Sequence, residues 1–377
     1  MSMITPPIML AEMRRIARED LAPLVVKIDL EGFYPEEVLR TIGAAGGFRQ
    51  HLASQQTSSS CDMPTAIEAM AVAGEQCMAT AFMMWCQNAC GWYLENSENQ
   101  ELRHRILPRI AAGEALGGTA LSNPMKFYSG IEPLLLKAQK VPGGFSVRGQ
   151  LPWVSNLGPE HHFGAIFQVD GKPGREVMAL VPCRAEGLRM VQSAHFVALE
   201  GTRTFSVRFD DVFIPAESIL ADPAVPYLAK VRSGFILMQT GMALGLIQGS
   251  IDIMQKADRT HEHINRFLPD RPNAFQEQLT ALREEVYNLA RTPWEQGNAF
   301  WRRVLAARLL ASQLSIATAS AALLHAGARG YLNNAPAQRR LRESHFVAIV
   351  TPSMKHLCKE LAAAHGNGSM AAGPTTA

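Results

Sequence analysis

The spacing of hydrophobic residues changes twice along the chain. Up to about residue 115, apolar positions recur every three or four residues, a period that predicts helices. From residue 134 to residue 213 the period is two, and Gly- and Pro-containing turns separate short segments, which predicts strands. After residue 226 the helical period returns over four stretches, 228–258, 273–291, 294–328 and 337–363. The pattern therefore predicts an α+β protein, in which a middle antiparallel β-barrel or sandwich separates an N-terminal helical domain from a C-terminal four-helix bundle.

These changes of period set the expected domain boundaries. We expect an N-terminal helical domain at 1–115, a middle β-domain at 116–222, a C-terminal helical bundle at 223–365 and a flexible tail at 366–377. The tail is rich in Gly, Ala and Thr, a composition typical of a frayed terminus. The almost uncharged stretch 77–93 predicts a helix buried within its domain or between subunits, and its methionines are expected to fill core space.

The bulk composition is that of a soluble globular protein. Of the 377 residues, 47% are hydrophobic and 19% are charged, and the formal net charge is +2, so neither a nucleic acid nor a membrane is an expected partner. No run approaches the roughly 20 apolar residues that a membrane span needs, and no signal-peptide pattern is present. The six cysteines form no CxxC pair and have no His–Cys ligand spacing, so neither a metal site nor a disulfide framework is expected. These features predict a cytoplasmic protein.

The candidate chemistry is concentrated at residues 117–156, where the helical pattern gives way to the strand pattern. Two turns with hydroxyl side chains, 121–124 and 153–156, stand on either side of a predicted hairpin. Their hydroxyls and backbone N–H groups, with the ring of Trp153 as an aromatic wall, are the mixed lining expected of a site for a planar cofactor. The spacing alone leaves a second interpretation open, because turns rich in Ser, Asn and Pro often serve only to reverse the chain.

Several motifs resemble those of the acyl-CoA dehydrogenases. Residues 118–130 resemble the family segment in which a small residue is followed by Thr-Glu-Pro and then by Gly-Ser-Asp, although the loop is one residue longer here. Residues 151–156 resemble the family's Lys-x-Trp-Ile-Thr-Asn motif. Residues 201–204 and 209–215 are similar to the end of the family's β-domain, and the similarity extends from about residue 10 to about residue 360. The resemblance implies a flavoprotein oxidoreductase that acts on a CH–CH group of an acyl thioester, with FAD between the β-domain and the bundle.

The resemblance also assigns contacts to the flavin. It implies that Leu121 and Ser122 meet the pyrimidine side of the isoalloxazine ring. Trp153 and Ser155 would flank the reactive edge of that ring. Ser129 is the expected hydroxyl on the pyrophosphate side.

Toward the adenosine half of FAD the chain departs from the family. The family uses an Arg-x-x-Phe-Gly motif and a Gln before Gly-Gly-x-Gly, whereas residues 265–269 and Leu324 stand at these places here. Arg266 remains a candidate for a phosphate contact, while Gly327 and Gly330 either permit a close backbone approach or simply end a helix. Weaker adenosine contacts also suit FMN, which has no adenosine half.

The largest departure is at the catalytic base. The family's usual glutamate corresponds to Thr351, and a threonine hydroxyl cannot accept a proton at neutral pH without an activating group. A minority of the family places the base on the first bundle helix, but residues 233–239 contain no acid. His345 is a candidate replacement, because it lies near position 351 and histidine has a suitable pKa. Further histidine candidates are His161, His162, His325 and His356.

Three interpretations remain open. The first is an acyl-CoA dehydrogenase-like enzyme with an altered or displaced base, which passes electrons to an electron-transfer partner. The second is a relative that uses reduced flavin and dioxygen, as the superfamily's monooxygenases do, and therefore needs no base at position 351. The third is a non-catalytic binding or accessory subunit that kept the fold. Under all three, the apolar bundle helices predict a homodimer or homotetramer.

Overall fold

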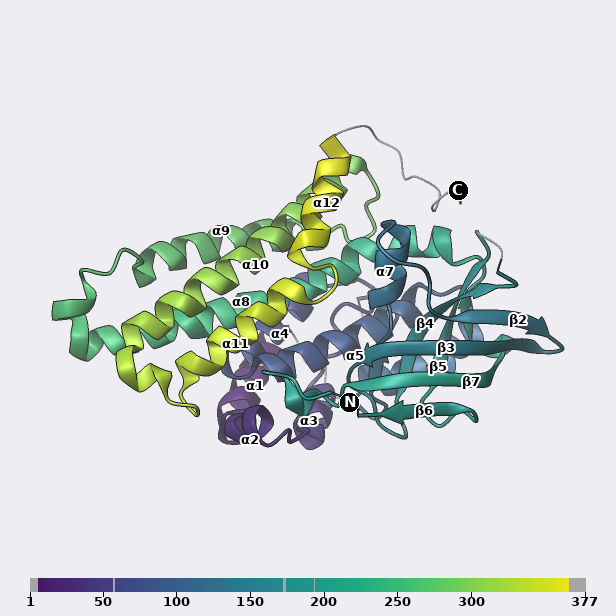
Figure 1. The fold of residues 1–377 in the computed structure, drawn as a ribbon, viewed down its shortest axis with the longest axis horizontal. Helices are drawn as coiled ribbons and strands as arrows, with labels where there is room; N and C mark the ends of the chain where they lie inside the picture. The colour runs from purple at the N-terminus through teal and green to yellow at the C-terminus, as the bar shows by residue number, and fades with distance from the viewer. Residues whose placement is uncertain (1–5, 57, 172–173, 193, 366–377) are drawn as a thin grey trace.

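The computed structural model describes residues 6–56, 58–171, 174–192 and 194–365, so the predicted tail at 366–377 lies outside the described residues. Three groups of elements follow one another along the chain: N-terminal helices, a central sheet and C-terminal helices (Figure 1). This arrangement confirms the α+β fold class. The N-terminal helices are α1 (Pro6–Ile16), α2 (Val25–Leu30), α3 (Glu36–Ala44), α4 (Met63–Gln76), α5 (Met78–Asn96) and α6 (Gln100–Ala111).

The central sheet has eight strands, and one short helix, α7 (Ser122–Tyr128), is inserted after its first strand. The strands are β1 (Gly117–Thr119), β2 (Lys137–Val141), β3 (Gly144–Val154), β4 (His162–Val169), β5 (Glu176–Pro182), β6 (Leu188–Val191), β7 (Phe205–Pro215) and β8 (Ile219–Ala221). Their order across the sheet is β6-β7-β3-β2-β4-β5-β8, with β1 paired to β4.

The prediction of a purely antiparallel sheet is corrected, because the sheet is mixed. The predicted hairpin between β2 and β3 is present, with Val141 opposite Gly144. Strand β4, however, returns on the far side of β2 and runs parallel both to β2 and to β1. Two changes of direction separate β2 from β4, so two strands that become neighbours in this way must run parallel. Periodicity along one strand carries no information about such a pairing.

Strands β4 and β5 are buried on both faces because they separate two cores. Ile166 and Met178 belong to the large core of the helices, whereas the adjacent residues Phe167 and Ala179 belong to the core of the sheet. Successive side chains of a strand point to opposite faces, so both faces of these strands must be apolar. The sheet is thereby fixed against the helices, which positions the ends of its strands relative to the C-terminal helices.

The C-terminal helices are α8 (Ala224–Asn265), α9 (Pro272–Ala290), α10 (Asn298–Ala326), α11 (Pro336–Ile349) and α12 (Met354–His365). The single last helix expected over 337–363 is therefore wrong, since residues 350–353 interrupt it. Pro352 explains the interruption, because proline lacks an N–H donor and disfavours helical geometry in the residue before it. The residue before it is Thr351, so the break itself sets the backbone of the expected base position.

Helices α4 and α8 cross at two glycines. A Cβ atom added to Gly245 would lie 2.7 Å from the Cα atom of Gly74, closer than real Cβ atoms approach. The absence of side chains at these positions lets the two backbones come into contact, and the crossing fixes α8 within the core.

Two helices of the described part are long and apolar enough to cross a membrane by length and composition, in contrast to the expectation that no such run exists. For α8, 94% of the apolar window is buried inside the protein, as expected for a core helix. For the segment Asn298–Tyr331 the buried share is 50%.

Candidate active site

The two hydroxyls predicted from distant parts of the sequence meet in the structure. Ser122 is the first residue of α7 and Thr351 lies in the break between α11 and α12. Their side-chain oxygens are 2.8 Å apart and share a hydrogen bond. The turn expected at 121–124 is therefore the beginning of a helix, which tolerates Pro124 in its first turn because the N–H groups there have no partner within the helix. This contact joins the β-domain side of the molecule to the C-terminal helices.

Behind this pair, the backbone of Thr351 is held by a buried amide and a buried guanidinium. Gln239 of α8 donates a hydrogen bond of 3.0 Å to the carbonyl of Thr351. The amide oxygen of Gln239 in turn accepts from Nε of Arg308 on α10 at 2.6 Å. Arg308 also donates from Nη2 to the carbonyl of Val347, at 2.6 Å, in the last turn of α11. The end of α11 is thus fixed by two side chains from two other helices.

The groups at the expected base position are hydroxyl, amide and guanidinium. Within the described residues, no carboxylate is hydrogen-bonded to Ser122, Thr351 or Gln239, and none forms an ion pair with Arg308. Burial lowers the pKa of Arg308 to about 9. At neutral pH this side chain is therefore still a cation, and no group among these four can serve as a proton acceptor in the way a carboxylate does.

The second predicted hydroxyl, Ser155, lies just past the end of β3 and belongs to a chain of hydroxyls. Its Oγ is 2.7 Å from Oγ1 of Thr204, which is 2.8 Å from Oγ1 of Thr202. Thr202 donates to the carbonyl of Leu199 at 2.7 Å. Such a chain fixes the orientation of the Ser155 hydroxyl before any ligand is present.

Trp153 is one of the most exposed large aromatic side chains in the described structure. Its residue is 61% exposed, and its ring meets the edge of Phe196 at a centroid distance of 6.3 Å. An exposed indole costs hydrophobic free energy, which a stacked planar ligand would recover. Trp153 and Ser155 are close in the sequence, and no hydrogen bond or ring contact in the described structure joins them to Ser122.

Ser129 and Leu121 lie at the two ends of α7. The hydroxyl of Ser129 is 2.7 Å from Nε2 of His356 on α12, and Lys359 donates to its carbonyl oxygen. Burial lowers the pKa of His356. Leu121 is buried, and its carbonyl accepts the first hydrogen bond of α7 from the N–H of Met125 at 2.9 Å. Helix α12 therefore packs on the segment that was expected to serve the phosphate side of the cofactor.

The remaining predicted residues likewise form no hydrogen bond or ring contact with Ser122 or Thr351 in the described structure. Arg266 is exposed, with its guanidinium 5.0 Å above the ring of Phe267. Gly327 has a φ of +62° and ends α10, as a helix-terminating glycine does, and Gly330 is buried in the following turn. His345 is exposed, and its Nδ1 donates to the carbonyl of Leu341 at 2.9 Å.

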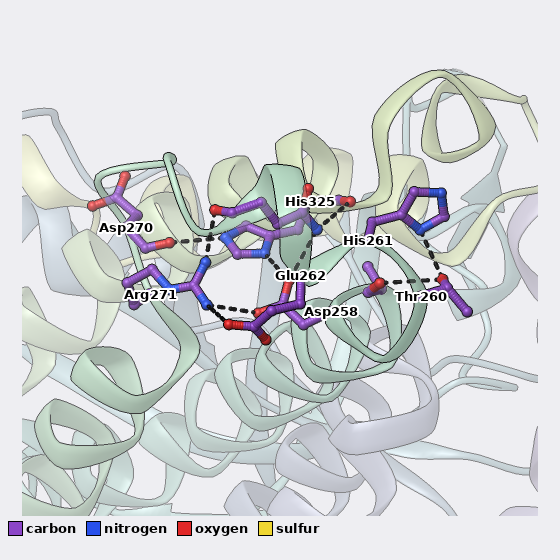
Figure 2. Close-up of polar contacts among 9 residues, drawn as sticks. Asp258, Thr260, His261, Glu262, Asp270, Arg271 and His325 are labelled. Carbon is purple, nitrogen blue, oxygen red and sulfur yellow. Dashed lines mark hydrogen bonds and ion pairs between the residues drawn. The ribbon is translucent and has the colours of Figure 1, made fainter.

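A second polar cluster, shown in Figure 2, holds the junction of α8, α9 and α10. Nδ1 of His325 is 2.9 Å from a carboxylate oxygen of Asp258, and its Nε2 is 2.8 Å from the carbonyl of Asp270. Both ring nitrogens are thus engaged by groups of the cluster, so His325 serves as a buried contact between the helices. Asn265 and Arg271 also donate to the Asp258 carboxylate. Burial acts to raise the pKa of Asp258, but its hydrogen bonds outweigh that effect and the pKa lies below its usual value.

Sequence reasoning missed Gln239, Arg308 and Asp258. Gln239 ends the stretch 233–239, in which a glutamine carries no signal of a base. Arg308 stands inside the apolar run 304–311, and a lone charge in such a run was a usable signal of a buried polar contact. Asp258 and His325 are 67 residues apart, and no local pattern links them.

Two surface hollows of about 530 Å³ lie elsewhere, one along α9 and one beside Arg148 and Asp211. Neither is lined by a residue of the predicted site. Among the described residues, no three His, Cys, Asp or Glu side chains are grouped as metal ligands.

Comparison with known proteins identifies the family. The family model described as acyl-CoA dehydrogenase, N-terminal domain, matches residues 8–114. Cyclohexane-1-carbonyl-CoA dehydrogenase of Geobacter metallireducens is 23% identical over 355 residues, covering 89% of this chain and 90% of the relative. Together these matches support membership of the acyl-CoA dehydrogenase superfamily.

Solved structures of similar fold include enzymes of two reaction types. Butyryl-CoA dehydrogenase from Megasphaera elsdenii matches with a TM-score of 0.82 at 16% identity, covering 97% of this chain and 100% of that chain. Dibenzothiophene monooxygenase from Paenibacillus sp. A11-2 matches with a TM-score of 0.78 at 17% identity, covering 94% and 95%. The latter enzyme has also been solved with FMN bound. At these identities the likenesses show the acyl-CoA dehydrogenase fold but leave the reaction of this superfamily member open.

Proposed function

We propose that this superfamily member is a flavin-dependent oxidoreductase whose reaction does not use a carboxylate base at position 351. The flavin ring would lie between the sheet and the C-terminal helices, held by Leu121 and Ser122 on one side and by Trp153 and Ser155 on the other. Ser129 would serve its phosphate side. When bound, a flavin supplies two-electron redox chemistry and, once reduced, reactivity toward dioxygen.

The observation that carries this proposal is the hydrogen bond between Ser122 and Thr351, with Gln239 and Arg308 behind it. Removal of a proton next to a thioester needs a positioned base, and none of these four groups is one. Oxygenation by a reduced flavin needs no such base. We therefore favour a reaction of reduced flavin and dioxygen with a small organic substrate. FMN is as suitable as FAD, because within the described residues Arg266 and Gly327 form no hydrogen bond or ring contact with Ser122, Thr351, Trp153 or Ser155.

Dehydrogenation of an acyl thioester with a displaced base is the second candidate. It is favoured by the similarity to acyl-CoA dehydrogenases over 89% of the chain. His345 is the candidate base, because its Nδ1 donates to Leu341 and its Nε2 is therefore left to accept a proton. This reaction would require an electron-transfer partner. Under either reaction we expect a cytoplasmic homodimer or homotetramer.

Replacing Trp153 with Ala tests the placement of the flavin. We expect the dissociation constant of the flavin to rise about tenfold, because the ring loses an aromatic wall, and we expect the protein to remain folded because this side chain is largely exposed. Fluorescence titration with FMN and FAD measures the change. Phe213→Ala is the matched control, since Phe213 is an exposed aromatic residue on β7 outside the predicted site. Equal affinity in the wild type and the Trp153 variant would contradict this placement.

Replacing His345 with Ala separates the two candidate reactions. If His345 is the displaced base, the variant keeps its flavin but loses anaerobic bleaching by an acyl-CoA. Under the favoured reaction, His345→Ala leaves oxygen consumption by the reduced protein unchanged. Stopped-flow spectra taken anaerobically with butyryl-CoA, and then with dioxygen, distinguish these outcomes.

The proposal as a whole is tested by mixing the chemically reduced holoprotein with dioxygen and scanning aromatic and sulfur-containing substrates for oxygenated products. Product formation supports the oxygenase. Bleaching of oxidised flavin by an acyl-CoA supports the dehydrogenase instead. A protein that binds no flavin in either redox state would be the non-catalytic accessory subunit.

A further inference from the structure

Arg308 differs from the other deeply buried arginine of the C-terminal helices. Arg340 is also buried, but it forms an ion pair with Glu343 at 3.1 Å. Arg308 is fully buried and donates only to neutral acceptors: the amide of Gln239, the hydroxyl of Ser312 and the carbonyl of Val347. In the described structure no carboxylate balances its charge. A cation without a countercharge in the core is costly, so its retention points to a function for the charge.

Gln239 links Arg308 to Thr351 through two hydrogen bonds, so the charge of Arg308 polarises the groups between them. Its amide oxygen accepts from Arg308, and its amide nitrogen donates to the carbonyl of Thr351. A donor in contact with the oxygen of an amide polarises that amide and strengthens its N–H as a donor. The carbonyl of Thr351 is thereby occupied, and the group of this residue that faces Ser122 is the hydroxyl.

The Ser122–Thr351 pair has one donor to spare. Each hydroxyl carries one O–H, and the bond between them uses only one of the two. Neither hydroxyl has a further partner in the described structure. Ser122 is exposed and Thr351 half-buried, so a ligand can reach them. The neighbouring Asn123 donates a hydrogen bond to the carboxylate of Glu132. That carboxylate forms an ion pair with Lys126 at 3.1 Å, so its repulsion of a bound anion is reduced.

We infer that Arg308, acting through Gln239, makes the Ser122–Thr351 pair a binding site for an oxyanion of the substrate, of the carboxylate or phenolate type. The site therefore stabilises negative charge at the position where the dehydrogenases of the superfamily remove a proton. Arg308 and Gln239 are positioning residues, since neither touches the ligand. The inference rests on the proposed function for the identity of the ligand as substrate, but anion binding itself requires no flavin.

The test uses 4-nitrophenol as the probe, because its anion absorbs visible light and its neutral form absorbs in the near ultraviolet. Difference spectra of the purified protein with 4-nitrophenol, taken across a pH series, measure the pKa of the bound probe. We expect binding to lower that pKa by about one unit, which corresponds to about tenfold preference for the anion. The neutral compound 4-nitroanisole should bind no better to the wild type than to the variants.

Four variants test whether the charge of Arg308 causes the pKa shift of the bound probe. Arg308→Met should abolish the shift, and Arg308→Lys should retain most of it. Gln239→Glu should abolish it in a folded protein, because the new carboxylate pairs with Arg308 and removes the N–H donor to Thr351. Arg303→Met, on the same helix but exposed and paired with Glu285, should leave the shift unchanged.

Several outcomes would overturn the inference. These are a bound probe that titrates like the free compound, a probe that binds at no pH, and a shift that survives in Gln239→Glu. If Arg308→Met fails to fold, the Lys and Glu variants decide. Flavin binding is measured in the same preparations. A wild type that binds no flavin but shifts the pKa of bound 4-nitrophenol would refute the proposed function alone. A wild type that binds flavin but leaves the pKa of 4-nitrophenol unchanged would refute the oxyanion site alone.

Discussion

Replacing Thr351 with Glu is expected to make the flavin of this protein reducible by an acyl-CoA under anaerobic conditions. The substitution places a carboxylate where the resemblance locates the superfamily's base, beside Ser122 and with Gln239 still holding the backbone carbonyl of residue 351. A positioned general base contributes a factor of about 10²–10⁴ to the rate of proton removal. Stopped-flow spectra of flavin bleaching with butyryl-CoA should show a gain of that order over the wild type.

Thr351→Gln is the matched control for this gain, because it has the size of glutamate but cannot accept the proton. Its bleaching rate should stay at the wild-type level. Equal rates in the Glu and Gln variants would mean that residue 351 does not face the reacting carbon. A wild type that is already bleached as fast as the Glu variant would mean that another base is at work, and the displaced-base dehydrogenase would become the leading function.

Replacing Asp258 with Asn is expected to lower the free energy of unfolding by about 2 kcal/mol at pH 7. The substitution removes the carboxylate charge that pairs with Arg271 and that lies beside the ring of His325 at the junction of α8, α9 and α10 (Figure 2). Urea unfolding measures the change. Asp270→Asn is the matched control, because Asp270 contributes only its backbone carbonyl to His325 and its side chain is exposed. A loss of similar size in both variants would show that the buried carboxylate is not what stabilises this junction.

The pH dependence of this effect follows from the direction of the pKa shift of Asp258. Its pKa is lower in the folded protein than its usual value, which is about 3.9. The stabilisation it contributes is therefore complete above about pH 4 and is lost as the pH falls through the lower, folded-state pKa. The stability difference between wild type and Asp258→Asn should shrink as the pH falls through that acidic range.

The part of the candidate site that adjacent residues encode can be predicted from the sequence. Motifs of adjacent residues predict Ser122, Trp153 and Thr351 as site residues, and the structure brings two of them, Ser122 and Thr351, into contact across 229 positions. The hydrophobic pattern predicts one helix across Thr351, whereas the structure interrupts it at residues 350–353, beside Pro352. A period of hydrophobic residues continues across such a break, so the backbone rule for proline is the better guide there.

The partners of the residues behind the site could not be inferred from local patterns. Arg308 acquires its role from Gln239 on one helix and Val347 on another, and only the packing of three helices brings these groups together. The parallel pairing of β4 with β2 likewise depends on which edge of the hairpin the chain returns to, and alternation within each strand is the same for both edges.

The most direct test of the central claim is equilibrium binding of oxidised and reduced FMN and FAD to the purified protein, followed by visible absorption and fluorescence. We predict saturable binding of at least one flavin, with a resolved shift of its visible band, and a weaker affinity in Trp153→Ala. Absence of binding by every flavin in both redox states would contradict the claim that this superfamily member is a flavin-dependent enzyme.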